Sequence, residues 1–244
     1  MDFPRLNFHI HSRFSDGENS IKQIVRASLK LGLKYIAITD HFSDSWKARV
    51  IPTLNSVEKI DLYLKKLKDC KDFLFKSNKN LLLFSGIEID LSSSENFIRK
   101  LIHPEKFDLI LFEYMETLEG IAFVKNLINR WKENVKKEKL PLFGLAHFDP
   151  SFFIHDGFDI LINFLENNEI YFEFNSSYSK CYSRKNEMFF KKLKDYNVPV
   201  AIGCDSHALK FLNDYEDPVQ MIIYYGLERN YMLFLDKIMT KKTS

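Results

Sequence analysis

The sequence of 244 residues has few of the features that mark specialised classes of protein. Its three cysteines are odd in number and lack CxxC spacing, so neither a disulfide framework nor a cysteine zinc site is indicated. No apolar run approaches the roughly 18 residues of a membrane span. The chain starts with Met1-Asp2-Phe3-Pro4 rather than with a basic and apolar signal segment. We therefore expect a cytoplasmic protein without membrane contact.

The charge balance and the motif content exclude further classes. Lys and Arg total 35 against 33 Asp and Glu, so a formal charge of +2 creates no overall field for nucleic acid or anionic lipid. The sequence contains no P-loop, GxGxxG motif or internal repeat. Nucleic acid is thus a disfavoured partner, although a local basic patch would be compatible with this charge. The sequence does not determine the oligomeric state.

The composition is that of one large α/β domain. A hydrophobic content of 45% and an aromatic content of 15% can fill a substantial core. We expect a single domain over residues 1–240 and a frayed tail over residues 241–244.

Strand-like and helix-like segments alternate along the chain. The expected strands are 6–10, 35–39, 81–84 with an extension over 87–89, 107–112, 142–146, 170–174 and 198–202. The expected helices are 20–31, 56–76, 118–137, 159–166, 186–196, 218–225 and 232–239. This alternation indicates right-handed parallel βαβ units.

Nearly every strand is followed by a side chain that can bind a metal ion. The candidates are His9, His11, Asp16, His41, Glu88, Glu113, His147, Asp205 and His207. One His-x-His is weak evidence, because alternate residues of any strand share a face. The repetition is stronger evidence, because the carboxyl ends of parallel strands meet at one mouth of a barrel. An open sheet would gather its ligands at a single switch point, so we predict a closed, TIM-like barrel with seven strands, holding more than one metal ion.

The order of these motifs resembles a known family. His9-Ile10-His11, Ser15-Asp16-Gly17, Thr39-Asp40-His41, Gly86-Ile87-Glu88, Ala146-His147 and Gly203-Cys204-Asp205-Ser206-His207 follow one another as in the PHP (polymerase and histidinol phosphatase) family of metal-dependent phosphoesterases. The resemblance covers nearly the whole chain and is greatest to the small, single-domain members. It implies a distorted (β/α)7 barrel with two to three divalent ions, which would be Zn, Mn or Fe.

The resemblance also implies how the ligands are shared among three metal ions. The first ion would bind His9, His11, Glu88 and Asp205, and Glu88 would bridge to a second ion that His147 also binds. The third would bind Asp16, His41 and His207. Two bridged ions roughly 3.5 to 4 Å apart generate a metal-bound hydroxide near neutral pH, while a neighbouring cation can hold the phosphoryl oxygens. We assign catalysis to Glu88, Asp205 and His207.

One position departs from the family pattern. Many relatives supply a further histidine to the second metal after the fourth strand, where this chain has Leu111-Phe112-Glu113-Tyr114-Met115-Glu116. Glu113 is the predicted replacement, because a carboxylate is a suitable ligand at a strand end. Glu116 is the second choice, and an open coordination position is the third. A carboxylate here would favour Mn or Fe over Zn.

Substrate contacts and outlying residues are assigned on weaker patterns. Arg184 is the predicted phosphate ligand, since a guanidinium can form two parallel hydrogen bonds to phosphate oxygens. Asn175 either orients the substrate or a metal-bound water, or forms a turn. Lys185 and Arg13 are further candidates. We expect Asp40 to support an imidazole or a helix terminus from behind the site. His103 and His155 are expected on the surface.

The leading hypothesis is hydrolysis of a small phosphomonoester, as in histidinol phosphatases. A nuclease or phosphodiesterase that acts on nucleic-acid ends could use the same metals, but the chain lacks a basic and aromatic strip. The third hypothesis is a PHP-like scaffold that binds protein or RNA without catalysis. A scaffold would have lost ligands, whereas at least eight of the nine positions are retained here.

Overall fold

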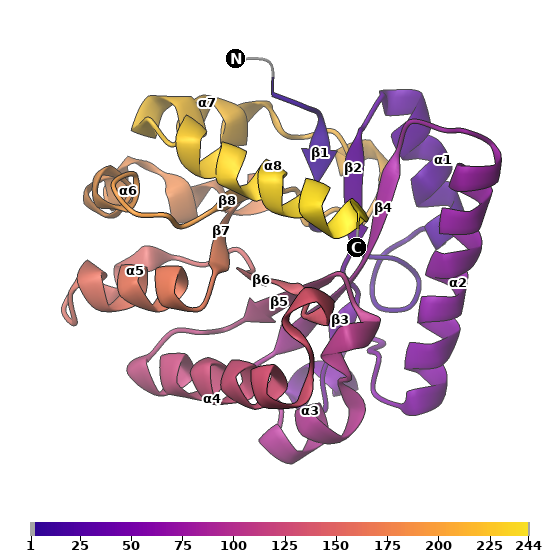
Figure 1. The fold of residues 1–244 in the computed structure, drawn as a ribbon, viewed down its shortest axis with the longest axis horizontal. Helices are drawn as coiled ribbons and strands as arrows, with labels where there is room; N and C mark the ends of the chain where they lie inside the picture. Colours follow the sequence, from indigo (N-terminus) through magenta and orange to yellow (C-terminus); the bar gives the residue numbers. More distant parts are fainter. Residues whose placement is uncertain (1–2, 244) are drawn as a thin grey trace.

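The computed structural model describes residues 3–243 and shows a barrel of parallel strands surrounded by helices (Figure 1). The strands are β1 (Leu6–Asn7), β2 (Tyr35–Ile38), β3 (His41–Phe42), β4 (Leu82–Asp90), β5 (Leu109–Glu113), β6 (Leu142–Leu145), β7 (Ile170–Asn175) and β8 (Val200–Gly203). Seven of them follow the order β1-β2-β4-β5-β6-β7-β8, and every pair is parallel. The predicted seven-stranded barrel is therefore confirmed.

The first and last strands meet and nearly close the barrel. The Phe8 amide donates to the Ile202 carbonyl at 2.9 Å, and the His11 amide donates to the Ser206 carbonyl at 3.0 Å. The segment predicted as one strand over 6–10 is regular only over β1, with a bridge from Ile10 to Ser206. The irregular segment that follows β1 contains the predicted ligands His9 and His11.

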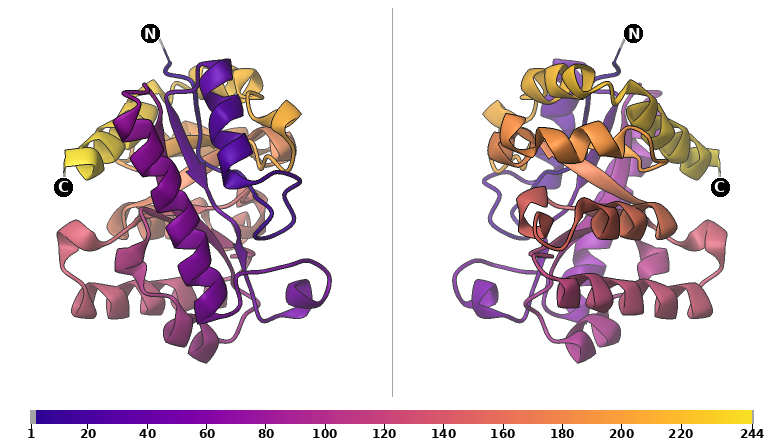
Figure 2. Two further views of the ribbon diagram at one scale, coloured as in Figure 1. Left: turned by 90° about the vertical axis from the view of Figure 1, so that its right-hand side faces the viewer. Right: turned by 90° about the vertical axis from the view of Figure 1, so that its left-hand side faces the viewer.

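Within residues 3–243, eight α-helices surround the barrel (Figures 1 and 2). They are α1 (Ile21–Leu31), α2 (Val57–Lys76), α3 (Glu95–Leu101), α4 (Leu118–Asn134), α5 (Phe158–Asn167), α6 (Glu187–Leu193), α7 (Glu216–Tyr225) and α8 (Glu228–Thr243). Ser20 and Gln23 form a capping box that starts α1, and Gly32 ends it in the left-handed conformation with φ 74°. No helix within residues 3–243 has the length and apolar character needed to cross a bilayer.

Several boundaries differ from the sequence-based expectation. The two strand segments at 81–84 and 87–89 form the single nine-residue strand β4. The short strand β3, which pairs with β4, and the short helix α3 were not predicted. Helix α8 extends to Thr243 and thus includes most of the tail expected to fray, while Ser244 and residues 1–2 lie outside the described residues.

Helix α8 packs against the barrel through an aromatic cluster. The Phe234 ring lies 4.9 Å from the Phe8 and Tyr171 rings, and Phe8 lies 5.2 Å from Phe84. Tyr171 is at the start of β7, two residues before Glu173, so both side chains share one face of that strand. The amino end of the barrel is thereby filled with apolar groups, and the polar groups gather at the other end.

Candidate metal centre

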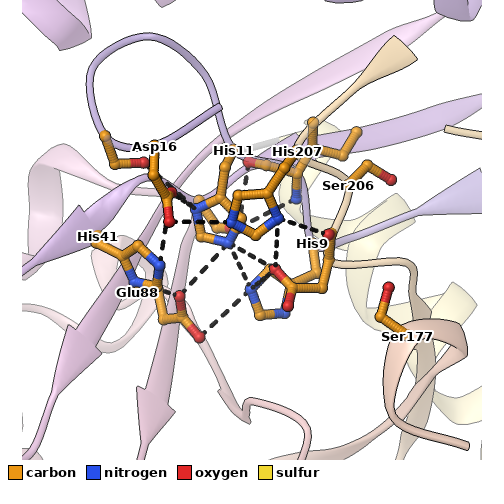
Figure 3. Close-up of polar contacts among 12 residues, drawn as sticks. His9, His11, Asp16, His41, Glu88, Ser177, Ser206 and His207 are labelled. Carbon is orange, nitrogen blue, oxygen red and sulfur yellow. Dashed lines mark hydrogen bonds and ion pairs between the residues drawn. The ribbon is translucent and has the colours of Figure 1, made fainter. Parts of the chain in front are cut away.

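The nine predicted ligands gather at the carboxyl-terminal end of the barrel. Figure 3 shows how six of them lie beside one another, namely His9, His11, Asp16, His41, Glu88 and His207. Three groups of residues each have ligand atoms that all lie within 4.8 Å of one another. The groups are His9, His11 and Asp205; His11, Asp16, His41 and His207; and His41, Glu88 and Glu113. Only His147 is outside these groups, and it contacts two of their members. The structure therefore brings all nine residues to one place.

The first cluster joins the start of the chain to the end of β8. His9 Nε2 and His11 Nε2 are 3.0 Å apart, and His11 Nε2 is 2.9 Å from Asp205 Oδ1. Asp205 Oδ1 also lies 3.5 Å from His9 Nε2. Two imidazole nitrogens and a carboxylate oxygen directed at one another form a donor set that suits a transition-metal ion.

A second cluster surrounds Asp16. Its carboxylate is 3.2 Å from His207 Nε2, 3.7 Å from His41 Nε2 and 3.8 Å from His11 Nδ1. His11 thus presents one ring nitrogen to each cluster. Burial raises the pKa of Asp16, but the hydrogen bond from His207 and the neighbouring imidazoles lower it overall, so the carboxylate is ionised.

Glu88 lies between the clusters. It is fully buried, with Oε2 2.7 Å from His41 Nδ1 and Oε1 3.3 Å from both His9 Nε2 and His147 Nε2. Burial opposes ionisation of Glu88, but His9 and His41 outweigh it and hold its pKa well below the usual range. Neither Glu88 oxygen accepts a well-aligned hydrogen bond from the described residues, nor does Asp16 Oδ1.

These orphaned oxygens test whether metal ions fit the site. A buried carboxylate oxygen without a partner is costly, and native proteins rarely leave one. Here the orphaned atoms point at imidazole nitrogens that are themselves suitable ligands. The residues present therefore fit a cluster of divalent ions.

Glu113 has a different environment from the other carboxylates. Its Oε1 is 3.6 Å from His147 Nε2 and its Oε2 is 3.8 Å from His41 Nδ1, so it lies beside the predicted second metal position. Lys47 Nζ also donates to both oxygens, at 2.6 and 2.5 Å. Sequence reasoning missed Lys47, which no motif contains. Glu116, the second choice for this ligand, is exposed and belongs to none of the groups within the described chain.

Three residues at these strand ends have left-handed backbone conformations. They are Tyr114 with φ 66°, His147 with φ 33° and Asp205 with φ 46°, which follow β5, β6 and β8. Such conformations cost on the order of 1–3 kcal/mol for residues other than glycine and are concentrated at functional sites. The local backbone is therefore shaped to direct His147 and Asp205 rather than to optimise stability.

Asp40 supports the loop that carries Asp16. Its Oδ1 accepts hydrogen bonds from the Ser12 and Ser15 amides and the Ser15 hydroxyl, and its Oδ2 accepts one from the Ser12 hydroxyl. Gly17 closes the same loop, where an added Cβ would lie 2.2 Å from the His11 carbonyl oxygen. The predicted supporting role of Asp40 thus acts through a loop instead of through an imidazole or a helix terminus.

Glu173 is a buried carboxylate that the sequence reasoning did not select. It lies 2.9 Å from His9 Nδ1 through Oε1, and its Oε2 accepts the His147 amide at 2.7 Å. Gly203 makes room for it, since a Cβ there would be 1.8 Å from Glu173 Oε1. Burial opposes protonation of His9, but Glu173 and the other carboxylates raise its pKa well above the usual value. The available signal was its position two residues before Asn175, on the same face of β7.

The predicted substrate ligands lie in two different settings. Asn175 is buried, accepts the Ser177 amide at 3.1 Å within a turn and donates to Glu173 Oε2 at 3.0 Å, and its contact with a substrate stays a prediction. Arg184 is exposed, and its Nε and Nη2 donate to the Tyr224 hydroxyl at 3.1 and 2.9 Å. Lys185 pairs with Asp149, and Arg13 donates to the Glu18 carbonyl. His103 and His155 are exposed, as expected.

Aromatic side chains border the centre. Tyr178 stacks on the His147 ring at 4.3 Å, and Trp46 lies 6.5 Å from Tyr114. Their exposed fractions are 56% for Trp46, 39% for Tyr114 and 42% for Tyr178. Flat apolar groups are therefore available at the rim to contact a bound molecule.

Comparison with known proteins identifies a matching family model, a curated relative and several solved structures with the same fold. The sequence model of the PHP domain matches residues 7–232. A segment of 85 residues is 33% identical to DNA polymerase/3'-5' exonuclease PolX of Bacillus subtilis (strain 168), covering 35% of this chain. That segment is only 14% of the curated relative's length, so this chain spans a small part of it.

The solved structures share the fold at low sequence identity. Histidinol phosphate phosphatase HISK of Lactococcus lactis, solved with Zn, L-histidinol and phosphate, superposes with a TM-score of 0.63 at 15% identity, covering 92% of this chain and 95% of that one. YwqE of Bacillus subtilis and CpsB of Streptococcus pneumoniae, described as metal-dependent tyrosine phosphatases, give a TM-score of 0.58 at 17% identity, with 97% and 94% covered.

Proposed function

The chain belongs to the PHP domain family, and we propose that it is a metal-dependent phosphoesterase that hydrolyses a small phosphomonoester at a trinuclear centre. The observation that carries this proposal is the set of buried, orphaned oxygens of Glu88 and Asp16 among five histidines. Divalent ions in such a set supply Lewis-acid polarisation of phosphoryl oxygens and an activated water. The proposed ions are Zn, Mn or Fe.

We assign the ligands as the contacts suggest. His9, His11 and Asp205 would hold the first ion, His147 and Glu113 the second, and Asp16, His41 and His207 the third, with Glu88 shared. Glu88, Asp205 and His207 should matter most for catalysis, because each contacts more than one cluster. Asp205 Oδ1, for example, lies 2.9 Å from His11 Nε2 and 3.7 Å from His207 Nδ1.

The remaining side chains position these ligands. Glu173 fixes the orientation of the His9 ring, and a hydrogen bond to the distal nitrogen of an imidazole raises its basicity as a ligand. Asp40 holds the Asp16 loop. Burial of the ligands in the barrel mouth limits water and strengthens every charge interaction there.

The rim favours a leaving group that carries an aromatic ring. Trp46, Tyr114 and Tyr178 present ring surface beside the second metal position, where a planar group could stack. The solved structures with the same fold are described as a histidinol phosphate phosphatase and as tyrosine phosphatases, and histidinol and tyrosine both contain an aromatic ring. We propose that phosphomonoesters whose leaving group carries an aromatic ring, whether an aryl ester such as phosphotyrosine or an alkyl ester such as histidinol phosphate, are better substrates than esters without a ring.

A substrate panel tests the proposal. Protein loaded with Mn, Zn or Fe is assayed against p-nitrophenyl phosphate, phosphotyrosine, histidinol phosphate, glycerol phosphate and short oligonucleotides. His9→Ala serves as the inactive variant, and His155→Ala, at an exposed histidine, serves as its matched control. Hydrolysis of oligonucleotides alone would establish the nuclease alternative. No hydrolysis by metal-loaded protein would favour the scaffold. The cytoplasmic location stays a prediction.

A further inference from the structure

Lys47 is a buried cation inserted beside the proposed metal centre. Its side chain belongs to the short 3-10 helix Trp46–Arg49 in the connection between β3 and α2, and only 6% of the residue is exposed. Its ammonium donates to both oxygens of Glu113, at 2.6 and 2.5 Å, and lies 5.0 Å from the centre of the Tyr114 ring. A lysine whose Nζ donates to both oxygens of one carboxylate is held there as an ammonium ion.

The connection that carries Lys47 is anchored rather than free. It projects from the barrel as a loop with one helical turn (Figure 2). The Ser43 and Ser45 hydroxyls both donate to Asp90 at the end of β4, and the Leu54 amide donates to the His41 carbonyl at 2.8 Å. Residue 47 is thus placed by hydrogen bonds to the same strands that carry the ligands.

Glu113 differs in this contact from the other ligand carboxylates. Within residues 3–243, Asp16, Glu88 and Asp205 form ion pairs with histidines alone, and Glu88 has two orphaned oxygens. Both Glu113 oxygens are instead satisfied by one ammonium. A carboxylate whose lone pairs already accept from a cation is a weaker ligand for a second cation.

We propose that Lys47 competes with the divalent ion for Glu113, so that the position formed by Glu113 and His147 binds metal more weakly than the other positions. This inference rests on the proposed function. An entering ion would have to displace at least one Lys47–Glu113 hydrogen bond and would be repelled by the ammonium in a buried setting, where charge repulsion is little screened. Lys47 would thereby make occupancy of this one position depend on the metal supply.

Calorimetric titration of metal-free protein with Mn²⁺ tests the proposal without reference to activity. Lys47→Met removes the charge and keeps the length, Lys47→Gln is a second neutral variant in case the first is poorly folded, and Lys47→Arg keeps the charge. Lys71→Met is the matched control, because Lys71 also pairs with a carboxylate, Asp108, at 2.6 Å. Among the described residues, Asp108 forms no ion pair with a proposed metal ligand. We expect the weakest class of sites to tighten at least about tenfold in both neutral variants, with no change in Lys47→Arg or Lys71→Met.

Two further variants separate failure of this inference from failure of the proposed function. Glu113→Gln and His147→Ala should each reduce the number of bound ions by one. If they do, but the neutral Lys47 variants bind the weakest ion equally or less tightly, Lys47 positions Glu113 and the competition is overturned. If neither variant changes the number of bound ions, the Glu113 and His147 metal position itself is overturned.

Discussion

Glu173 Oε1 lies 2.9 Å from His9 Nδ1, so a carboxylate on β7 fixes the ring of a histidine near the opposite end of the chain. Both residues are buried, with exposed fractions of 1% and 0%. The contact leaves His9 Nε2 directed at His11, Glu88 and Asp205. The ring orientation of a proposed ligand thus depends on a residue that belongs to none of the metal-ligand groups.

Glu173→Gln is expected to weaken metal binding. An amide cannot stabilise a protonated or metal-bound imidazole as a carboxylate does, and loss of such partners typically lowers metal affinity about 10- to 100-fold. Competition with a chromogenic chelator would measure the change. Glu105→Gln, at an exposed position, is the control. Equal metal affinity in Glu173→Gln and the unaltered protein would show that His9 needs no orientation.

His9→Ala or Asp205→Ala is expected to lower hydrolysis by at least about a hundredfold, because each removes a ligand from the first cluster. Thermal stability of the metal-loaded protein should also fall, since bound metal stabilises the native state. Steady-state kinetics and thermal unfolding with and without chelator would measure both effects. Activity within a few-fold of the parent would contradict the catalytic assignment.

Metal binding at neutral pH is expected to release protons. In the metal-free protein burial opposes protonation of His207, but its hydrogen bond to Asp16 raises its pKa to about 9. The pKa of His147 is also raised, since Glu88 outweighs burial. Ligand imidazoles must be neutral, so metal affinity should increase from pH 7 to pH 9. Titration in buffers of different ionisation enthalpy would count the protons, and no release at pH 7.5 would contradict protonated histidines.

The same shift has a defined effect on the stability of the metal-free protein. The folded-state pKa of His207 lies above the usual 6.5, so its contribution is fully present below pH 6.5 and is lost as the pH rises through about 9. Denaturant unfolding between pH 6 and pH 10 should show this loss. His207→Gln should flatten the profile over that window.

Arg184→Ala tests the proposed phosphate ligand. If Arg184 leaves Tyr224 to bind phosphate oxygens, kcat/KM should fall roughly 10- to 100-fold with unchanged metal content, because a charge-assisted contact is lost. Arg184→Lys should recover only part of the activity. Tyr224→Phe, which removes the hydroxyl that accepts from Arg184, is the control for the resting contact. Unchanged kinetics and phosphate inhibition in Arg184→Ala would leave Arg184 as a surface residue.

The alternation of helices and strands was sufficient to predict the barrel. Such elements are predictable because hydrophobic periodicity and capping residues act over a few neighbouring positions. The helix predicted over 20–31 agrees with α1, because the capping roles of Ser20 and Gly32 depend on neighbouring residues alone. Prediction was weaker for β3 and α3. Each is short, and β3 exists because His41 and Phe42 pair with residues of β4 that lie far along the chain.

The nine predicted ligands show the same difference between what neighbouring residues determine and what distant residues determine. Their chemical types and their places after successive strands were visible in the sequence, because parallel strands bring their carboxyl ends together. The partners of those ligands were not visible. Glu173 meets His9 from 164 positions away, and Lys47 meets Glu113 from 66 positions away.

By itself, the sequence determined the order of strands and helices, the barrel that this order closes and the ligand-type residues at its mouth, because these depend on local periodicity and on residue chemistry. Only the tertiary structure decided which oxygens are orphaned, which carboxylate orients His9 and which one pairs with an ammonium. These features depend on side chains that meet across the barrel, and on the path of the loop that carries Lys47, neither of which local sequence encodes.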